Sequence, residues 1–174
     1  ATEYLARALE LARIDSEIIF IEWNPPRNRP LLVDQFDMPQ AMRHVTIRAF
    51  IVPAECHDRF PRSQEAAFYT GEAANVGLRR ARGRFATPKA SDSFFSPDVI
   101  EMIARRNLDP DTMYRIDRHD VAIEDESIWD LPDDVLLAKL AGLPSSPHAW
   151  IDQKAHWGLR NLHTNACGDF TLMS

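Results

Sequence analysis

The chain has 174 residues, of which 45% are hydrophobic and 26% charged, a composition typical of a globular protein with a buried core. The net charge of −6 argues against a general nucleic-acid-binding protein, because such proteins present a basic surface. The longest apolar runs, such as residues 18–21, are too short to cross a membrane, so we expect neither a transmembrane segment nor a secretory signal.

The first half of the chain alternates between helical and strand patterns. Apolar residues at helical spacing predict an amphipathic helix over residues 3–13. Residues 17–22 contain the continuous apolar run 18–21 and end in an acid, a pattern typical of a strand buried on both faces in a parallel sheet. A polar loop follows to about residue 43, and a second strand is predicted over residues 45–52.

The middle of the chain continues this alternation. We predict a helix over residues 63–82, with Gly83 as its C-cap, followed by a short strand over residues 84–87. Residues 96–98, Ser-Pro-Asp, predict the start of a helix that runs to about residue 107. Serine is a good N-cap, proline suits the first helical position, and an acid in the first turn complements the helix dipole.

The last third contains shorter elements. We predict a strand over residues 113–117, an acidic loop over 117–130, a helix over 132–141, a link over 142–147, and a tail over 161–173 that ends as a strand. The order of elements indicates an α/β fold, an open and mostly parallel sheet with helices on both faces.

Two loops follow the carboxyl ends of predicted strands, where ligands bind in sheets of this kind. One contains Glu22 and Asn24, and the other covers residues 89–93 with Asp92. A carboxylate at the first position can accept hydrogen bonds from a nucleobase or a ribose, and one at the second can hold a divalent metal on a diphosphate. The alternative is that Glu22 caps a turn and that Asp92 is solvated.

Several segments, in the same order along the chain, resemble family 2 glycosyltransferases. Residues 17–22, EIIFIE, look like the family strand that ends in an acid contacting the uracil of a UDP-sugar. Residues 73–85, AANVGLRRARGRF, look like the family segment A-R-N-x-G-x-x-x-A-x-G-E-Y. Together with residues 114–120 and 168–172, these two segments resemble a bacterial subgroup of family-2-like enzymes, encoded in gene clusters for surface polysaccharides. The similarity covers most of the chain and is strongest over residues 73–96.

The resemblance implies an incomplete GT-A fold. In that reading, residues 1–120 form the nucleotide-sugar-binding part, and residues 121–174 begin the acceptor-side part of a single domain. The family's fold begins with a strand and loop that hold the nucleotide, and this chain starts at the helix that follows them. The family's general base lies beyond the strand that ends here at Ser174.

The resemblance also assigns residues to the donor site. Glu22 and Asn24 would bind the base or the ribose, while Asn75 and Lys89 would contact the ribose-diphosphate region. Arg79 belongs to an arginine cluster over residues 79–84 that could clamp phosphates. The preferred reading of the cluster is that its cations offset the dipole at the end of a helix on an ordinary charged face.

Metal and general-base assignments depend on positions where the chain departs from the family. Asp92 matches the last acid of the D-x-D metal motif, but Ala90 and Ser93 stand where the family has its neighbouring acids, and Ala74 replaces an arginine. One carboxylate with a diphosphate would bind Mg²⁺ or Mn²⁺ weakly, so metal dependence is in doubt. Asp169 is the nearest candidate for the general base, although in the family this position more often shapes the sugar pocket.

The predicted function is therefore transfer of a sugar from a nucleotide-sugar donor, with UDP favoured, to a hydroxyl of a saccharide acceptor. The predicted location is the cytoplasm, at the inner face of the membrane. The alternative is a non-catalytic nucleotide-sugar-binding or scaffold module of the same fold. A third hypothesis is a thiol hydrolase using Cys167 near His163, although two free thiols, Cys56 and Cys167, suit any protein of a reducing compartment.

Overall fold

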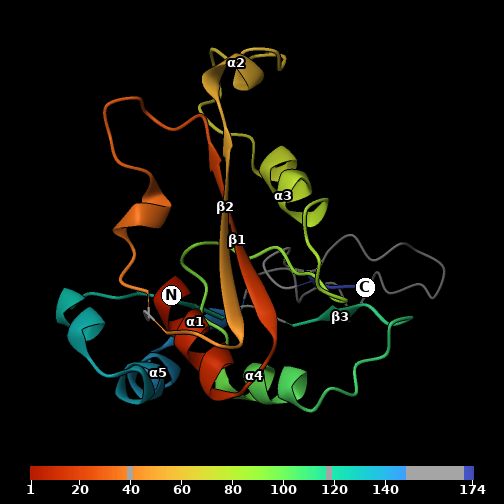
Figure 1. The fold of residues 1–174 in the computed structure, drawn as a ribbon. Helices are drawn as coiled ribbons and strands as arrows, with labels where there is room; N and C mark the ends of the chain where they lie inside the picture. Colours follow the sequence, from red (N-terminus) through yellow and green to blue (C-terminus); the bar gives the residue numbers. More distant parts are fainter. Residues whose placement is uncertain (39–40, 117–118, 148–170) are drawn as a thin grey trace, which may run out of the picture.

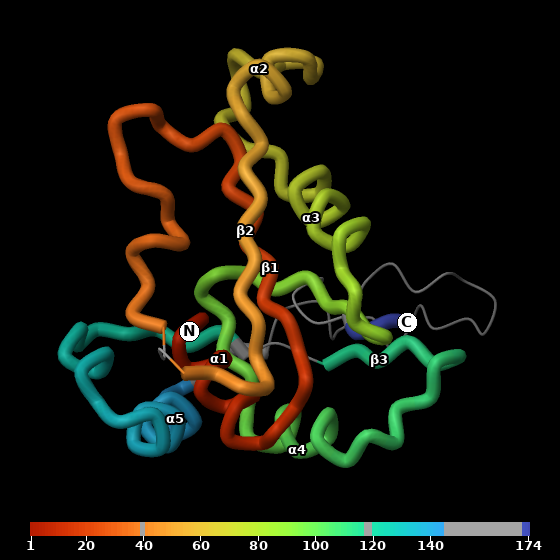
Figure 2. The backbone as a smooth tube through the Cα atoms, in the orientation of Figure 1, coloured from red at the N-terminus to blue at the C-terminus, as the bar shows by residue number. Residues whose placement is uncertain are grey.

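The computed structural model describes residues 1–38, 41–116, 119–147 and 171–174, and Figures 1 and 2 trace their arrangement. The elements in chain order are α1 (Thr2–Leu11), β1 (Ser16–Trp23), the 3₁₀ helix η1 (Leu32–Gln35), β2 (Val45–Val52), α2 (Ala54–His57), α3 (Thr70–Leu78), α4 (Pro97–Ala104), β3 (Tyr114–Arg115), β4 (His119–Val121), the 3₁₀ helix η2 (Glu126–Asp130), α5 (Asp133–Gly142), β5 (Ser145–Pro147) and β6 (Thr171–Leu172).

Strands β1 and β2 pair in parallel, in a register that runs from Ser16 opposite Val45 to Trp23 opposite Val52. This confirms both predicted strands and their parallel pairing. Helix α3 lies against one face of the pair, where a Cβ placed on Gly77 would lie 3.5 Å from Cγ1 of Ile21. Figure 1 shows α3 on one side of the two strands and the chain between β1 and β2 on the other.

The core lies on the opposite face of the sheet, near the start of β2. Its buried side chains come from α1, β2, the segment before α4, α4 and β6: Leu5, Ala6, Leu9, Val45, Phe95, Val99, Ile100 and Leu172. Ile18 and Ile47 pack against this cluster from the two strands. Because side chains of a strand alternate between faces, the sheet has an α3 face and a core face. Helices therefore flank both faces, and the mixed α/β class is confirmed.

Helix α1 behaves as its sequence predicts, and its acids fix the neighbouring loop. The carboxylate of Glu10 accepts hydrogen bonds from the backbone N–H groups of Arg43 (2.9 Å) and His44 (2.8 Å). Glu3 accepts one from Asp37 at 2.8 Å. The entry to β2 is thereby tied to the helix that covers it.

The prediction of a mostly parallel sheet is wrong for the described part of the chain. There β1–β2 is the one parallel pair, while β3 pairs with β6 and β4 with β5 in the antiparallel direction. The predicted strand at 84–87 contributes a single bridge, Ala86 to Met173. Residues 16–21 of β1 are also half-buried rather than fully buried. Among the described residues, no further strand lies beside either outer edge of the pair.

The prediction of a helix over residues 63–82 is wrong at both ends. Helix α3 spans only Thr70–Leu78, and its C-cap is Arg79 in a right-handed conformation, so Gly83 is not the cap. The residues before it instead fold around the end of β1: the Tyr69 hydroxyl donates to the Pro61 carbonyl at 2.6 Å, and Tyr69 packs on Trp23. These contacts exist only in the folded chain, so local helical spacing does not indicate them.

The predicted helices at 96–107 and 132–141 are confirmed as α4 and α5. Ser96 caps α4, its side chain accepting from the backbone N–H of Val99. The predicted acidic loop and link contain short elements instead, namely β4, η2 and β5. Within the described ranges, no helix combines the length and the apolar character needed to cross a membrane.

Candidate functional site

Glu22 lies at the carboxyl end of β1, buried, with both carboxylate oxygens in use. One oxygen accepts the backbone N–H of Leu32 at 2.8 Å and the other that of Val33 at 3.0 Å, at the start of η1. The free N–H groups at the start of a helical turn are natural partners for an acid. Glu22 thus holds the loop on the core face of the sheet, as the turn-capping alternative predicts. Its contact with a nucleobase stays a prediction.

Asn24 ends the parallel pair in a left-handed conformation, with φ of 49°. Its backbone N–H donates to the carbonyl of Val52 at 2.7 Å, which extends the β1–β2 pairing by one hydrogen bond. Asparagine tolerates this conformation better than most residues with a side chain. The position of Asn24 therefore has a conformational explanation that is independent of any ligand.

Asn75 and Arg79 lie one helical turn apart at the exposed end of α3. The carbonyl of Asn75 accepts the backbone N–H of Arg79 at 3.1 Å, as expected for the last turn of a helix. Both side chains are exposed. Because α3 covers the α3 face and Glu22 points to the core face, these residues and Glu22 belong to different faces of the sheet.

Lys89 and Asp92 share the segment between the Ala86 bridge and α4. The Lys89 ammonium donates to the carbonyl of Ala90 at 2.8 Å, and Asp92 is exposed in a turn that the Ser93 N–H closes onto Ala90 at 3.3 Å. In the described part of the chain, no group of three or more His, Cys, Asp or Glu side chains could hold a metal ion. The weak metal site that the resemblance implies at Asp92 also needs oxygens of the diphosphate, so it stays a prediction.

Two other predicted residues, Asp169 and Cys167, lie outside the described residues, as does His163. Cys56 is a half-buried free thiol. The general-base assignment of Asp169 and the thiol-hydrolase hypothesis therefore stay predictions.

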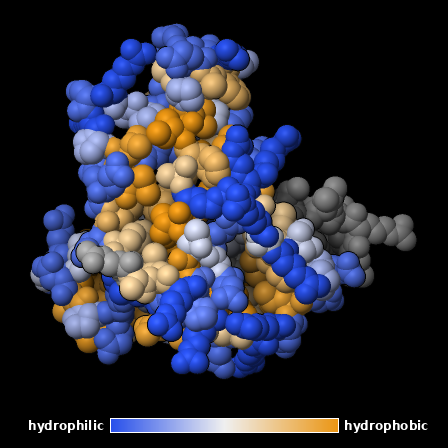
Figure 3. All heavy atoms as spheres, in the orientation of Figure 1, coloured by the Kyte–Doolittle hydropathy of each residue, from blue (hydrophilic) through white to orange (hydrophobic). Residues whose placement is uncertain are grey.

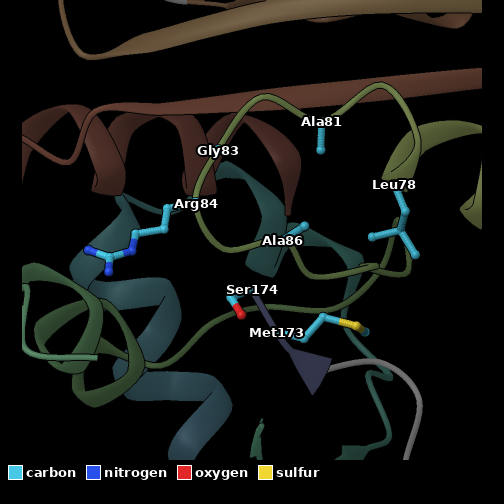
Figure 4. Close-up of a pocket in the computed structure, with 7 residues that line it drawn as sticks. All are labelled: Leu78, Ala81, Gly83, Arg84, Ala86, Met173 and Ser174. Atoms are coloured by element: carbon cyan, nitrogen blue, oxygen red, sulfur yellow. The ribbon is translucent and has the colours of Figure 1, made fainter. Parts of the chain in front are cut away.

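One hollow of about 220 Å³ lies beyond the end of α3. Figure 4 shows its lining: Leu78, Ala81, Gly83, Arg84, Ala86, Met173 and Ser174. The side chains are mostly small or apolar, and the guanidinium of Arg84 points away from the others (Figure 4). No residue of the predicted donor site lines this hollow.

A larger hollow, of about 300 Å³, lies at the carboxyl end of β2 beside α3; we call it the β2–α3 pocket. Its lining consists of Trp23, Phe50, Ile51, Val52, Pro53, Cys56, Phe60, Val76 and Arg80. Three of the predicted donor-site residues, Glu22, Asn75 and Arg79, do not line this pocket. The residue that follows each of them in the sequence does: Trp23, Val76 and Arg80. The aromatic residues at 23, 50 and 60 were a signal for it that spacing rules do not capture.

An ion pair supports the same face of the sheet. Arg48 donates to the Glu17 carboxylate at 2.6 Å, and both side chains are largely buried, with 19% and 14% of their surfaces exposed. Glu17 also accepts a hydrogen bond from the backbone N–H of Arg82. Burial raises the pKa of the Glu17 carboxyl, but the hydrogen bonds from Arg48 and Arg82 outweigh burial, and its pKa lies below the usual value.

Compared with models of protein families, with curated proteins and with solved structures, the chain gives no match.

Proposed function

We propose that this chain is the nucleotide-sugar-binding part of a glycosyltransferase. The donor is a sugar linked to a nucleoside diphosphate, with uridine favoured, and the acceptor is a hydroxyl of a saccharide destined for a surface polysaccharide. The proposal places the reaction in the cytoplasm, at the inner face of the membrane. The proposal also assigns the α/β fold described above to one specific type, the GT-A fold.

The observation that carries the proposal is where the family-like segments lie. The EIIFIE segment is β1 of a parallel pair, with its acid at the carboxyl end, and the segment 73–85 begins in α3, the helix that packs on that same strand. Ligands of α/β sheets bind beyond the carboxyl ends of the strands, which is where Glu22 and Asn24 lie. The arrangement of Glu22 and Asn24 supports what the resemblance implies, whereas Asn75 and Arg79 lie on the other face of the sheet from Glu22.

In the proposed reaction, the acceptor hydroxyl attacks the anomeric carbon and the nucleoside diphosphate leaves with its bonding electrons. The proton of the hydroxyl goes to a carboxylate within hydrogen-bond reach. Asp169 has that role in the proposal, and Asn75, Arg79 and Lys89 contact the ribose and diphosphate. Inversion at the anomeric carbon is the outcome that the resemblance implies.

A second candidate is a nucleotide-sugar-binding or scaffold module without catalysis. The observation that favours it is that Asp92 is a single exposed carboxylate and that both oxygens of Glu22 already accept backbone hydrogen bonds. The two candidates share a donor site and differ in turnover.

Calorimetric titration of UDP-, GDP- and TDP-sugars into the protein expressed from its full reading frame tests the donor site. We expect saturable binding, tightest for the UDP-sugar, and a loss of about tenfold in affinity, or about 1.4 kcal/mol, in Asn75→Ala. Asp111→Asn is the matched control, because Asp111 is exposed and remote in sequence from the site. Absence of binding by all three donors would refute both candidates.

A further inference from the structure

The β2–α3 pocket lies on a different face of the sheet from Glu22, and the proposed function does not use it. Trp23 and Phe60 form one wall, with their ring centroids 5.3 Å apart, and Phe50 and Val76 contribute from β2 and α3. Figure 3 shows hydrophobic surface along β2, bordered by hydrophilic side chains on the side of α3. A volume of about 300 Å³ is small for a ligand site.

The wall of the pocket offers an aromatic surface whose polar atoms are already satisfied. Trp23 is buried, and its indole N–H donates to Nδ1 of His57 at 2.9 Å. Because the indole nitrogen is only a donor, Nδ1 of His57 accepts and Nε2 carries the proton, which it donates to the Ser63 carbonyl at 3.0 Å. A ligand group that packs on Trp23 therefore meets an aromatic face whose N–H is already paired, which favours an apolar or aromatic group.

The rim of the pocket carries the positive charge of Arg80. Its guanidinium lies 5.2 Å from the Phe50 ring centroid and donates to the Val76 carbonyl of its own helix at 3.2 Å. Arg48 lies over the same ring at 5.0 Å, but Glu17 neutralises it. No ion pair with an acidic side chain engages Arg80 among the residues that the structure describes.

We propose that the β2–α3 pocket binds a small phosphate monoester with an apolar or aromatic group. The apolar group packs beside Trp23 and Phe60, and the phosphate pairs with Arg80 at the rim. Arginine suits this task because its planar fork donates two parallel hydrogen bonds to a phosphate and stacks on an aromatic ring at the same time. The carboxylate of Glu22 is engaged by Leu32 and Val33 on the other face of the sheet, so it does not reach a ligand in this pocket.

The indole N–H signal of Trp23 provides a direct probe, since the chain has four tryptophans and each gives one such signal in a ¹⁵N–¹H correlation spectrum. Trp23→Phe assigns the signal by its loss. Phenyl phosphate and hexyl phosphate are titrated into the full-length protein, with inorganic phosphate and benzyl alcohol as the separate halves of the ligand.

We expect phenyl or hexyl phosphate to shift the Trp23 signal saturably, and the stronger of the two tells whether the apolar group is aromatic or aliphatic. Arg80→Gln should weaken binding about tenfold or more, because a charge-assisted pair is lost. Arg82→Gln, an exposed arginine two residues away, should change affinity by no more than about twofold. Val76→Phe should abolish binding by filling the pocket, which gives a second test that keeps Arg80.

Equal affinity in wild type and Arg80→Gln would overturn the proposal, as would an unshifted Trp23 signal or equal shifts of all four indole signals. Inorganic phosphate that binds as tightly as the two esters would also overturn it, because the apolar wall would then contribute nothing. Each variant is checked by its unperturbed amide spectrum, so a loss of binding is separable from a loss of folding.

Discussion

At the scale of single residues, glutamates in the first strand and helix accept backbone hydrogen bonds from distant parts of the chain. Glu10 holds the entry to β2, Glu22 holds η1, and Glu17 holds the turn after α3 through Arg82. A carboxylate that accepts backbone N–H groups satisfies donors that would otherwise be left without partners in a loop. These acids therefore stabilise the loops between elements.

Glu17→Gln tests this role at the glutamate that also pairs with a largely buried arginine, Arg48. The substitution keeps the shape but removes the charge that Arg48 and the Arg82 N–H require, so we expect the free energy of unfolding to fall by about 1–3 kcal/mol at pH 7. Because the folded-state pKa of Glu17 is lowered, its charged form stabilises the fold above the unfolded pKa of about 4.3. That stabilisation is lost as the pH falls through the folded-state pKa.

The measurement is urea unfolding of wild type and Glu17→Gln at pH values from neutral to about 3. The difference between the two proteins should be largest at neutral pH and should shrink on the acid side. Glu124→Gln, at an exposed position, is the matched control and should follow the wild type. A difference that is the same at every pH would show that the charge of Glu17 does not stabilise the fold.

Asn24 allows a conformational role to be separated from a ligand role. Asn24→Gly keeps the left-handed conformation and should change the free energy of unfolding by no more than about 0.5 kcal/mol, whereas Asn24→Val should cost about 1–2 kcal/mol. Urea unfolding measures both. If Asn24→Gly also keeps the full affinity for the UDP-sugar, the side chain of Asn24 does not contact the sugar donor. Similar stability of Asn24→Gly and Asn24→Val would contradict the conformational role.

At the scale of elements, alanine substitutions at Gly77 and Gly83, the two glycines of the family-like segment 73–85, should change the stability of the fold in opposite directions. A Cβ on Gly77 would lie at an ordinary contact distance of 3.5 Å from Ile21, so Gly77→Ala should stabilise α3 by about 0.5–1 kcal/mol through helix propensity. A Cβ on Gly83 would lie 3.0 Å from the Phe85 carbonyl oxygen, so Gly83→Ala should destabilise by about 1 kcal/mol.

Thermal unfolding of the two alanine variants distinguishes these effects. The midpoint should rise for Gly77→Ala and fall for Gly83→Ala. Gly71→Ala, where a Cβ meets nothing within 4 Å, is the control for helix propensity alone. A fall in the midpoint for Gly77→Ala would show that α3 and β1 pack more closely than the structure has them.

Elements whose signal is local could be predicted from the sequence, and those that depend on distant contacts could not. Helices α1, α4 and α5 and strands β1 and β2 follow from apolar spacing and from the Ser96 cap. The late start of α3 could not be predicted, because Tyr69 and His57 pack on Trp23 only once the chain has folded. The antiparallel pairing of β3 with β6 could not be predicted either, because it joins residues that are far apart in the sequence.

The candidate sites show the same limit. A strand-end acid could be found at Glu22, but its hydrogen bonds to Leu32 and Val33 depend on how the following loop returns to the strand. The β2–α3 pocket could not be found by motif, since its residues come from β1, β2, α3 and the segment around α2. Alternation along β1 nevertheless determines that Trp23 and Glu22 lie on opposite faces.

At the scale of the whole molecule, the sheet separates two surfaces with different chemistry. The core face carries α1, α4 and the Glu22 loop, and the α3 face carries an ion pair and an aromatic pocket. In the proposed donor site, Glu22 and Asn24 lie at the carboxyl end of β1, whereas Asn75 and Arg79 lie on α3, next to the proposed phosphate-ester site. The Trp23 signal and the Arg80→Gln variant test the phosphate-ester site separately, because neither residue belongs to the proposed donor site.

The central claim is that the protein transfers sugar, and the direct test is acceptor-dependent turnover. The protein from its full reading frame is incubated with a radiolabelled UDP-sugar and a mixture of saccharide acceptors, and both free UDP and labelled product are measured. We predict release of UDP that rises with acceptor, appears in equal amount with labelled product, and is lost in Asp169→Asn. Binding of the UDP-sugar without any release of UDP would contradict catalysis and would leave the non-catalytic module as the function.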